Sequence, residues 1–464
     1  MSYSWITFGQ AKSALAGRLG DPGKVFWKDD EIGRIINEAT RTWNSIAQFY
    51  RDRCTFNTED GIAFYDLTQS ANPNLITGNG GSGSQSASLM LGYSVTDQYL
   101  INDIQYHLIE PKTANFAGGW TGTEMFTMDD IVRAIERRRN LFLLLAGLHL
   151  NHSQVNYNPP LGDGRIVLLD SVQLVRRVSW LNLNNEFTPL WRDDEESANF
   201  LIPNWAINGE VPIAYSMIQT PPINIQVIPI SDDIGIVDLI TVDSPPNLNE
   251  IAGTLLSIPD DFSWVVKFGA LADLLGKDSQ AYDPQRSAYC EQRFQEGVRF
   301  ALSAGTINQV TLDGITIAPS DLADFDSLKP SWQNVSVATN QKIEDLAIVG
   351  RNLIAVSPVP NAESHSIQLD IVRNIPIPIN DGDFIQVGKE HFDAILDYST
   401  HLAMFKIGGA EFEGTATLAN RAMSQAMSHN RQLRAEAKDY DIMQRYSNKE
   451  DEDRLRMIKE KEAA

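Results

Sequence analysis

A repeated sequence pattern constrains the fold of this chain more than any other feature. Trp205 in "IPNWAINGEVP" aligns with Trp332 in "KPSWQNVSVAT" further along the chain. Pro229 in one β-rich segment aligns with Pro358 in another, at nearly the same spacing. Landmarks that share nearly one spacing rarely arise by chance, so we interpret the two segments as an internal duplication.

Each copy is predicted to end with a pair of helices. Ile258 aligns with Val387, at the same spacing as Pro229 and Pro358, and each precedes a segment with apolar residues at helical spacing. In the first copy this spacing predicts helices over residues 261–275 and 284–303. The turns between the paired helices are predicted at residues 276–283 in the first copy and 406–411 in the second.

The sequence before the duplication predicts further helices. Apolar periodicity predicts one after Asp29 and Asp30, whose charges favour a helix N-terminus, and another after Thr127. The segment "CTFNTEDGIAFYDL" predicts a β-hairpin around its Glu-Asp-Gly turn. Residues 97–110 are predicted to form either a strand or a short helix.

We therefore expect an α+β fold: a helical bundle of long amphipathic helices with two β-sandwich-like regions and an internal tandem duplication of a β-plus-helical-hairpin unit. Residues 1–163 are expected to form an N-terminal helical region with the hairpin and a flexible Gly/Ser loop at 77–88. The two copies are expected at 164–305 and 306–433. Residues 434–464 are densely charged, and we expect a helical tail or arm that orders against a partner.

Composition excludes several classes of protein. The 464 residues include 38 Lys and Arg against 60 Asp and Glu, and the net charge of −22 disfavours wrapping nucleic acid or binding anionic membranes. The two cysteines, Cys54 and Cys290, cannot make a disulfide scaffold and lie in apolar settings typical of a core. No secretory signal is recognised, and the longest apolar stretch, residues 141–150, is too short to span a bilayer.

The sequence predicts no catalytic site. "GNGGSG" at residues 78–83 matches the glycines of a dinucleotide-binding loop but lacks the flanking strand and helix that such a site needs. His149 and His152 lack an obvious third metal ligand, and the acidic run at 193–196 lacks the ligand spacing of a calcium loop. We therefore expect no enzyme activity, no metal and no cofactor.

Charged clusters are the candidate partner contacts. Arg137, Arg138 and Arg139 are expected on an exposed helix face. Arg176 and Arg177 follow each other in a strand, so we expect one to point outward and the other toward a partner in an interfacial ion pair. The candidate contacts in the tail are Arg434, Tyr440, Arg445, Tyr446, Arg454 and Arg456. The Gly/Ser loop is also expected to face a partner.

Three segments resemble the head–tail adaptor (neck or connector) proteins of tailed bacteriophages. "WKDDEIGRIINEATRTWNSIAQFYRDR" resembles their N-terminal helix, and "PNWAINGEVPIAYSMI" with the β-rich sequence after it is similar to their β region. "IPDDFSWVVKFGALADLLGKDSQAYDPQRSAYCEQRFQEGVRFA" resembles their closing helices, including a tyrosine, here Tyr289. The resemblance covers about two thirds of the chain and rests on apolar and turn patterns.

The resemblance implies a non-enzymatic virion protein, made in the cytoplasm of the bacterial host, that forms a homo-oligomeric ring, expected to be twelvefold. Such a ring lies in the neck between the portal protein and the tail and surrounds the DNA path, and a C-terminal arm docks on a neighbouring ring. Typical adaptors have one β-plus-helices unit, whereas this chain has two. An enlarged adaptor, a second neck ring and a tail component therefore all stay open.

The net charge suggests how such a ring treats DNA. An acidic lumen would repel DNA and let it pass without specific binding, since binding needs phosphate neutralisation by Lys and Arg. One alternative is a tail or collar protein that attaches fibres or binds a host receptor or glycan through exposed aromatic residues. Trp120, Trp180 and Trp191 are its candidates, although their strand-like surroundings favour core packing. Another alternative, a glycan hydrolase, would need paired carboxylates at a cleft.

Overall fold

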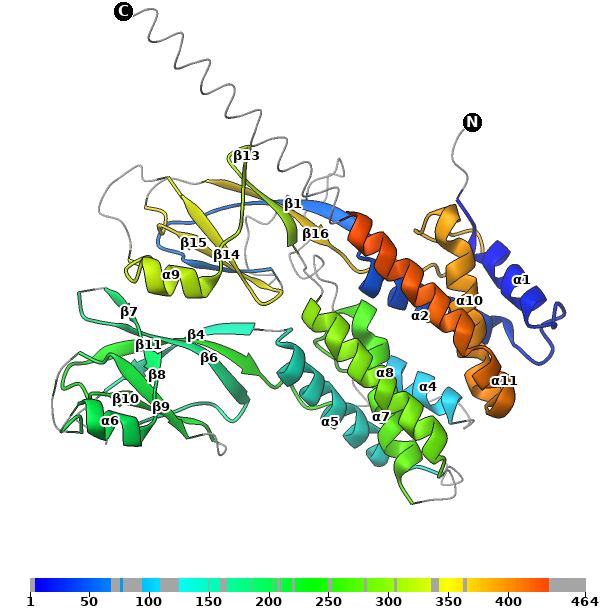
Figure 1. Cartoon of the computed structure of the whole chain (residues 1–464), viewed down its shortest axis with the longest axis horizontal. Coiled ribbons are helices and arrows are strands. Elements are labelled where there is room, and N and C mark those ends of the chain that lie inside the picture. The colour runs from blue at the N-terminus through cyan, green and yellow to red at the C-terminus, as the bar shows by residue number, and fades with distance from the viewer. Residues whose placement is uncertain are drawn as a thin grey trace, which may run out of the picture. The chain divides into compact units, whose positions relative to one another are not determined.

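The chain has a mixed α+β fold in a computed structural model (Figure 1). Its elements divide into two compact units: one combines the described residues up to Tyr50 with those from Ile375 onward, and the other spans Arg51–Asn374. The structure describes residues 5–67, 76–77, 94–108, 125–148, 150–158, 165–184, 186–202, 204–206, 209, 211–218, 222–248, 253–278, 282–303, 307–334, 342–361 and 365–433.

The first unit is helical. It contains α1 (Phe8–Arg18), α2 (Asp29–Ala47), α10 (Phe392–Ile407), α11 (Gly409–Gly414) and a further helical segment over residues 416–433. α2 begins at the predicted Asp29 and packs against α10, burying Ile32 and Ile36. The ion pair between Lys406 Nζ and Glu31 Oε1, at 3.1 Å, joins the same two helices. The apolar periodicity of α2 therefore marks its packing face.

Four helices of the second unit pack together at α7, which carries a buried lysine. They are α4 (Asp97–His107), α5 (Met128–Ala146), α7 (Ser263–Gly276) and α8 (Pro284–Ser303). Residues 97–107 are therefore helical, and α7 and α8 lie where the spacing predicts them. Lys267 on α7 is fully buried, and its Nζ lies 3.2 Å from Asp103 Oδ2 and 3.2 Å from His107 Nε2, both on α4. The Asp103 carboxylate balances the lysine charge inside the helices.

Two sheets with a common core form sandwich I. Their strand orders are β4-β11-β6-β7 and β5-β10-β9-β8. The strands are β4 (Leu150–Tyr157), β5 (Arg165–Val167), β6 (Val172–Leu181), β7 (Phe187–Pro189), β8 (Trp191–Arg192), β9 (Ala214–Ile218), β10 (Asn224–Ile228) and β11 (Gly235–Asp243), and α6 (Glu195–Leu201) follows β8. Trp180 is buried beside Gly235, where a Cβ would come within 2.3 Å of Trp180 Cζ2. The indole therefore requires glycine at that position.

Sandwich II is built from strands far apart in the sequence. Its sheets have the orders β13-β12-β16-β1-β3 and β14-β15-β2. The strands are β1 (Arg51–Asn57), β2 (Phe64–Asp66), β3 (Ile76–Thr77), β12 (Ile307–Leu312), β13 (Ile315–Ile317), β14 (Asp345–Val349), β15 (Leu353–Ser357) and β16 (Ser366–Val372), and α9 (Leu322–Leu328) lies between β13 and β14. Strands β1, β2 and β3, early in the chain, thus share sheets with strands that begin after residue 306.

The β-hairpin predicted over "CTFNTEDGIAFYDL" is wrong. β1 pairs with β16 and β3, whereas β2 pairs with β15 in the other sheet of sandwich II. Phe56 of β1 and Tyr65 of β2 face one core, with ring centroids 5.1 Å apart. The connection therefore crosses from one sheet to the other. A turn signal in the sequence predicts a change of direction but does not fix which strands pair.

Corresponding elements follow the same order in two parts of the chain. The start of β10 is separated from the start of β15 by the same spacing as Pro229 from Pro358, and so are the 3-10 turns η3 (Asp260–Phe262) and η4 (Lys389–His391). A nearly equal spacing separates α6 from α9, whereas α2 and α5 are closer together in the sequence. The strand order β4-β11-β6-β7 in sandwich I corresponds to β1-β16-β12-β13 in sandwich II. Pro229 and Pro358, which follow β10 and β15, both have cis peptide bonds before them.

Both cysteines are expected to resist alkylation in the native protein. Burial raises the pKa of Cys54 to about 12 and raises the pKa of Cys290 further, and the reactive species is the thiolate. A thiol-reactive dye at a pH of about 8 should label neither residue in buffer and both in concentrated guanidinium chloride. Rapid labelling of one thiol in buffer would contradict this prediction.

Among the described residues, no helix has both the length and the apolar composition needed to cross a membrane.

Candidate functional site

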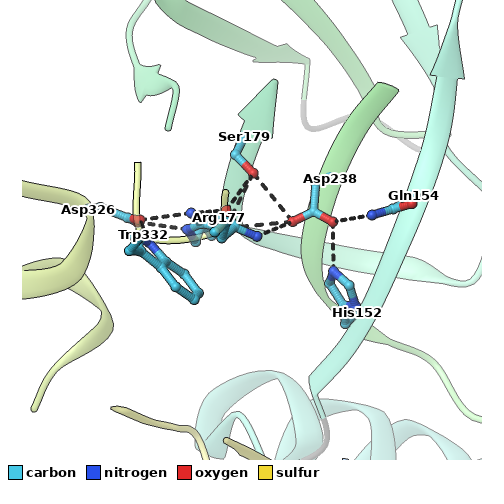
Figure 2. Close-up of polar contacts among 8 residues, drawn as sticks. His152, Gln154, Arg177, Ser179, Asp238, Asp326 and Trp332 are labelled. Atoms are coloured by element: carbon cyan, nitrogen blue, oxygen red, sulfur yellow. Dashed lines mark hydrogen bonds and ion pairs between the residues drawn. The ribbon is translucent and has the colours of Figure 1, made fainter. Parts of the chain in front are cut away.

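Arg177 on β6 forms the centre of a buried ionic contact between the two sandwiches (Figure 2). Its side chain is 7% exposed. The guanidinium makes two hydrogen bonds to Asp326 on α9, Nε to Oδ2 and Nη2 to Oδ1, both at 2.7 Å. Nη2 also donates to Gln333 Oε1 at 2.7 Å. This two-pronged geometry matches the planar fork of arginine to a carboxylate, so it fixes direction as well as distance.

Asp238 on β11 is a second carboxylate in the same contact and is more deeply buried than Asp326. It is 1% exposed, and its Oδ1 lies 2.7 Å from His152 Nε2 and 3.1 Å from Gln154 Nε2 on β4. Ser179 Oγ and Gln333 Nε2 donate to Oδ2 at 3.3 and 3.2 Å. A network in which each carboxylate oxygen has several partners can hold a charge away from water.

The Asp238 network predicts a loss of stability in acid. Burial alone would raise the pKa of Asp238, but the hydrogen bonds from His152, Gln154 and Gln333 outweigh it and hold the pKa below its ordinary value. A carboxyl group whose pKa is lowered by folding stabilises the native state above its unfolded pKa of about 4, and that contribution is lost as pH falls through the folded pKa.

The measurement compares the wild-type protein with Asp238→Asn, which cannot titrate at this position. Near neutral pH the wild type should unfold at a clearly higher urea concentration than the variant. The difference between the two midpoint concentrations should narrow as the pH falls below about 4. A difference that stays constant across this range would show that the titration of Asp238 does not contribute to stability.

Apolar packing surrounds the ionic contact. The contributors from sandwich I are Leu150, Leu174, Ile240 and Val242, and those from sandwich II are Phe64, Leu322, Phe325, Trp332, Ala347, Val349, Leu353 and Ala355. Trp332 Nε1 donates to Asp326 Oδ1 at 2.9 Å, and the Arg177 guanidinium lies 5.4 Å from a ring centroid of Trp332. The indole therefore supports both members of the ion pair.

Asn352 adds a second polar link within this contact. It is fully buried; its Nδ2 donates to the Leu150 carbonyl at 2.7 Å, and its Oδ1 accepts from the Leu150 amide at 2.9 Å. One side chain thereby satisfies both backbone groups of the first residue of β4. Ionic, apolar and backbone contacts together form the interface between the sandwiches.

The predicted arginine face on α5 lies mostly inside the protein. Arg139 is fully buried and donates to the Pro246 carbonyl at 3.1 Å, and burial lowers its pKa to about 10. Arg138 is mostly buried between Asp273 and Glu291, which tie it to α7 and α8. Only Arg137 has a largely exposed side chain, and it too pairs with Asp273. The expectation of an exposed basic face is therefore wrong for Arg138, which pairs with α7 and α8, and for Arg139, which bonds to the carbonyls of Pro245 and Pro246 after β11.

The structure places the other candidate residues in different environments. Arg176 is exposed and Arg177 buried, and the ion pair of Arg177 is made within the chain rather than with another molecule. His152 bonds to Asp238, and Asp194 in the acidic run caps α6 by accepting from the Ser197 amide. Outside the described residues lie His149, Trp120, the glycine motif at 78–83 and the tail contacts Arg434, Tyr440, Arg445, Tyr446, Arg454 and Arg456.

Sequence reasoning missed Asp238, Asp326, Gln333 and Lys267. Asp326 and Trp332 have the same separation as Asn199 and Trp205. This repeated spacing is the one sequence signal that could have drawn attention to Asp326. Lys267 lies in the apolar run "SWVVKFGALADLL", where its charge gives no hint of an acidic neighbour on another helix. Comparison of the chain with protein-family models gave no match, and comparison with curated proteins gave none either.

Proposed function

We propose that this chain is a non-enzymatic structural protein of a tailed bacteriophage, a ring-forming head-to-tail adaptor or neck protein that joins the portal to the tail. The observation that carries the proposal is the directional contact between the unlike faces of two corresponding sandwiches. A contact between unlike faces of like units is the kind that repeats around a ring. The resemblance of the helical and β-rich segments to phage adaptors supplies the protein class.

We infer further that the whole folding unit is duplicated, with one copy inserted into the other. One copy comprises α4, α5, sandwich I, α7 and α8, and the other comprises α1, α2, sandwich II, α10 and the helix at 416–433. The N-terminal caps Thr7 and Thr96 precede α1 and α4, and each makes an isolated β-bridge, to Phe384 and Leu255. The bridge partners Leu255 and Phe384 are separated by the same number of residues as the starts of β10 and β15. This common spacing supports a single duplication event for the unit.

The structural role is supported by how the charged groups are used. The buried ionic groups Arg177, Asp238 and Lys267 bond to other side chains of the chain, and these bonds hold sandwiches or helices together. A reactive site would instead aim such groups at a substrate. The neck location, and synthesis in the bacterial cytoplasm before assembly, follow from the proposed class.

Assembly of the purified full-length chain tests the proposal. Mass measurement and negative-stain imaging, with and without the portal protein of the same phage, should show closed rings with a central opening. The net charge of −22 should leave these rings unable to retain duplex DNA in a gel-shift assay at low salt. Chains that stay monomeric even with the portal, or rings that bind DNA tightly, would contradict the proposal.

One observation favours a second function, a tail or collar protein that attaches fibres or binds a host receptor or glycan. Trp191 is 67% exposed, contrary to the core packing expected of it, whereas Trp180 is buried as expected. An exposed indole beside strands suits stacking on a sugar. Specific signals on a glycan array, abolished by Trp191→Ala, would promote this function over the adaptor.

A further inference from the structure

The contact inside the chain joins two unlike surfaces. Sandwich II contributes what we call its helix face: α9, Trp332 and the side of the β14-β15-β2 sheet turned away from its core. Sandwich I contributes its strand face, the side of β6-β11-β4 turned away from its core, with Arg177 and Asp238. Because the sandwiches correspond, each has both faces, and the internal contact uses only one face of each.

The unused helix face of sandwich I has the same local construction. α6 and α9 have equal lengths and are capped by Asp194 and Asp321, which have the same spacing as Trp205 and Trp332. Trp205 Nε1 donates to Asn199 Oδ1 at 3.0 Å, as Trp332 Nε1 donates to Asp326 Oδ1. Asn199 therefore holds the position on α6 that Asp326 holds on α9.

The unused strand face of sandwich II also corresponds in register. In β6 the pairing with β11 shifts immediately before Arg177, and in β12 the pairing with β16 shifts immediately before Gln309. The next residues, Val178 and Val310, face the two cores. A bulge fixes which side chains point to which side of a strand, so Gln309 holds the position of Arg177.

Exposure marks the helix face of sandwich I as a surface open to a partner. Phe200 on α6 is 87% exposed and Trp191 on β8 is 67% exposed. A hollow of about 670 Å³ at the β5-β10-β9-β8 sheet is lined by Arg165, Arg192, Asp193, Asp194, Ser216, Met217 and Ile218. Large exposed aromatic residues next to a hollow are typical of a protein interface.

Both unused faces carry charged side chains of both signs. The helix face of sandwich I has Asp193, Asp194 and Glu196 around the start of α6, with Arg165 and Arg192 lining the hollow. The strand face of sandwich II carries Arg53, whose side chain is 59% exposed and pairs with Asp370, Nε to Oδ1 at 2.9 Å. In the internal contact a basic side chain on the strand face pairs with an acidic residue of the helix.

We propose that the helix face of sandwich I docks on the strand face of sandwich II in a second copy of this chain, repeating the contact already made within each chain. The inference rests on the proposed ring-forming function and names the interface that would build it. Chains joined in this way run head to tail, and a closed ring contains twice as many sandwiches as chains. Asn199 of one chain then lies beside Gln309 of the next.

Site-directed cross-linking tests the interface. Asn199→Cys and Gln309→Cys are purified separately, and a short bismaleimide is added to each alone and to their mixture; the native cysteines are buried. The mixture should give covalent dimers and each variant alone should not, because a head-to-tail contact never brings two identical positions together. Ser13→Cys on α1, exposed and outside both faces, replaces Gln309→Cys in the control mixture. Dimers absent from the test mixture, or equal in the control, would overturn the inference.

A second variant measures the energy of the interface. Asn199→Trp places a bulky side chain where the correspondence with Asp326 puts the contact, and it should raise the concentration needed for half-assembly by about tenfold or more. Ser13→Trp, at an exposed helix position outside both faces, should leave that concentration unchanged. Cross-links without closed rings or portal binding would keep this interface and reject the adaptor function. Portal-binding rings without cross-links, and indifferent to Asn199→Trp, would keep the function and reject this interface.

Discussion

Replacing Arg177 with methionine is expected to lower the free energy of unfolding by about 3–5 kcal/mol, because the largely buried Asp326 carboxylate (side chain 19% exposed) loses its charge partner. Asp326 loses both hydrogen bonds of the guanidinium, and Gln333 loses one. Urea denaturation followed by tryptophan fluorescence measures the change. The transition should also become broader if the sandwiches unfold separately once their fastening is lost.

Arg176→Met is the matched control for this experiment, since the neighbouring arginine is exposed. It should change the free energy of unfolding by less than about 0.5 kcal/mol. Adding Asp326→Asn to Arg177→Met should restore part of the loss by removing the unpaired charge. Equal effects of the two arginine variants would show that the ion pair does not stabilise the contact.

Replacing Trp332 with alanine is expected to cost about 3–5 kcal/mol, because it opens a cavity between the sandwiches. The indole is 3% exposed and packs against Phe64 and Phe325, with ring centroids 5.5 and 5.2 Å away. It also supports Asp326 through its Nε1 hydrogen bond. Thermal and chemical unfolding of the purified variant measure the loss.

Trp205→Ala provides a control at the corresponding position of sandwich I. Trp205 is half-buried, so its loss should cost the single chain only about 1 kcal/mol. If the helix face of sandwich I docks on another chain, this variant should instead weaken assembly. Similar losses in the free energy of unfolding for Trp332→Ala and Trp205→Ala would contradict the prediction, because they would show that the contact between the sandwiches contributes little to stability at Trp332.

Local patterns in the sequence predicted the helices well and the strand pairing poorly. Helix α2 begins at the predicted Asp29, and α8 has the predicted bounds, because helical hydrogen bonds and apolar spacing are properties of one short segment. Strand pairs join residues that are far apart. Arg51 of β1 pairs with Val372 of β16, and no feature of "CTFNTEDGIAFYDL" could predict that partner strand.

The candidate site was predictable only in part for a related reason. Strand geometry predicts that Arg176 and Arg177 point to opposite sides, one outward and the other toward a partner. The acidic partner was expected on another molecule, but Asp326 lies in the same chain, on a helix of the other sandwich. Charge alone likewise predicted an exposed face at Arg137–Arg139, because a sequence does not show which helix covers another.

The sequence by itself determined the mixed fold, the acidic character and the repeated spacing of its landmarks, since each depends on composition or on local order along the chain. Only the tertiary structure decided that β1, β2 and β3 complete sandwich II, and that a buried arginine joins one sandwich to the other through an ion pair. The physical reason is that burial and pairing are set by surfaces brought together from distant segments. The hydrogen bonds that satisfy a buried charge exist only once those surfaces meet.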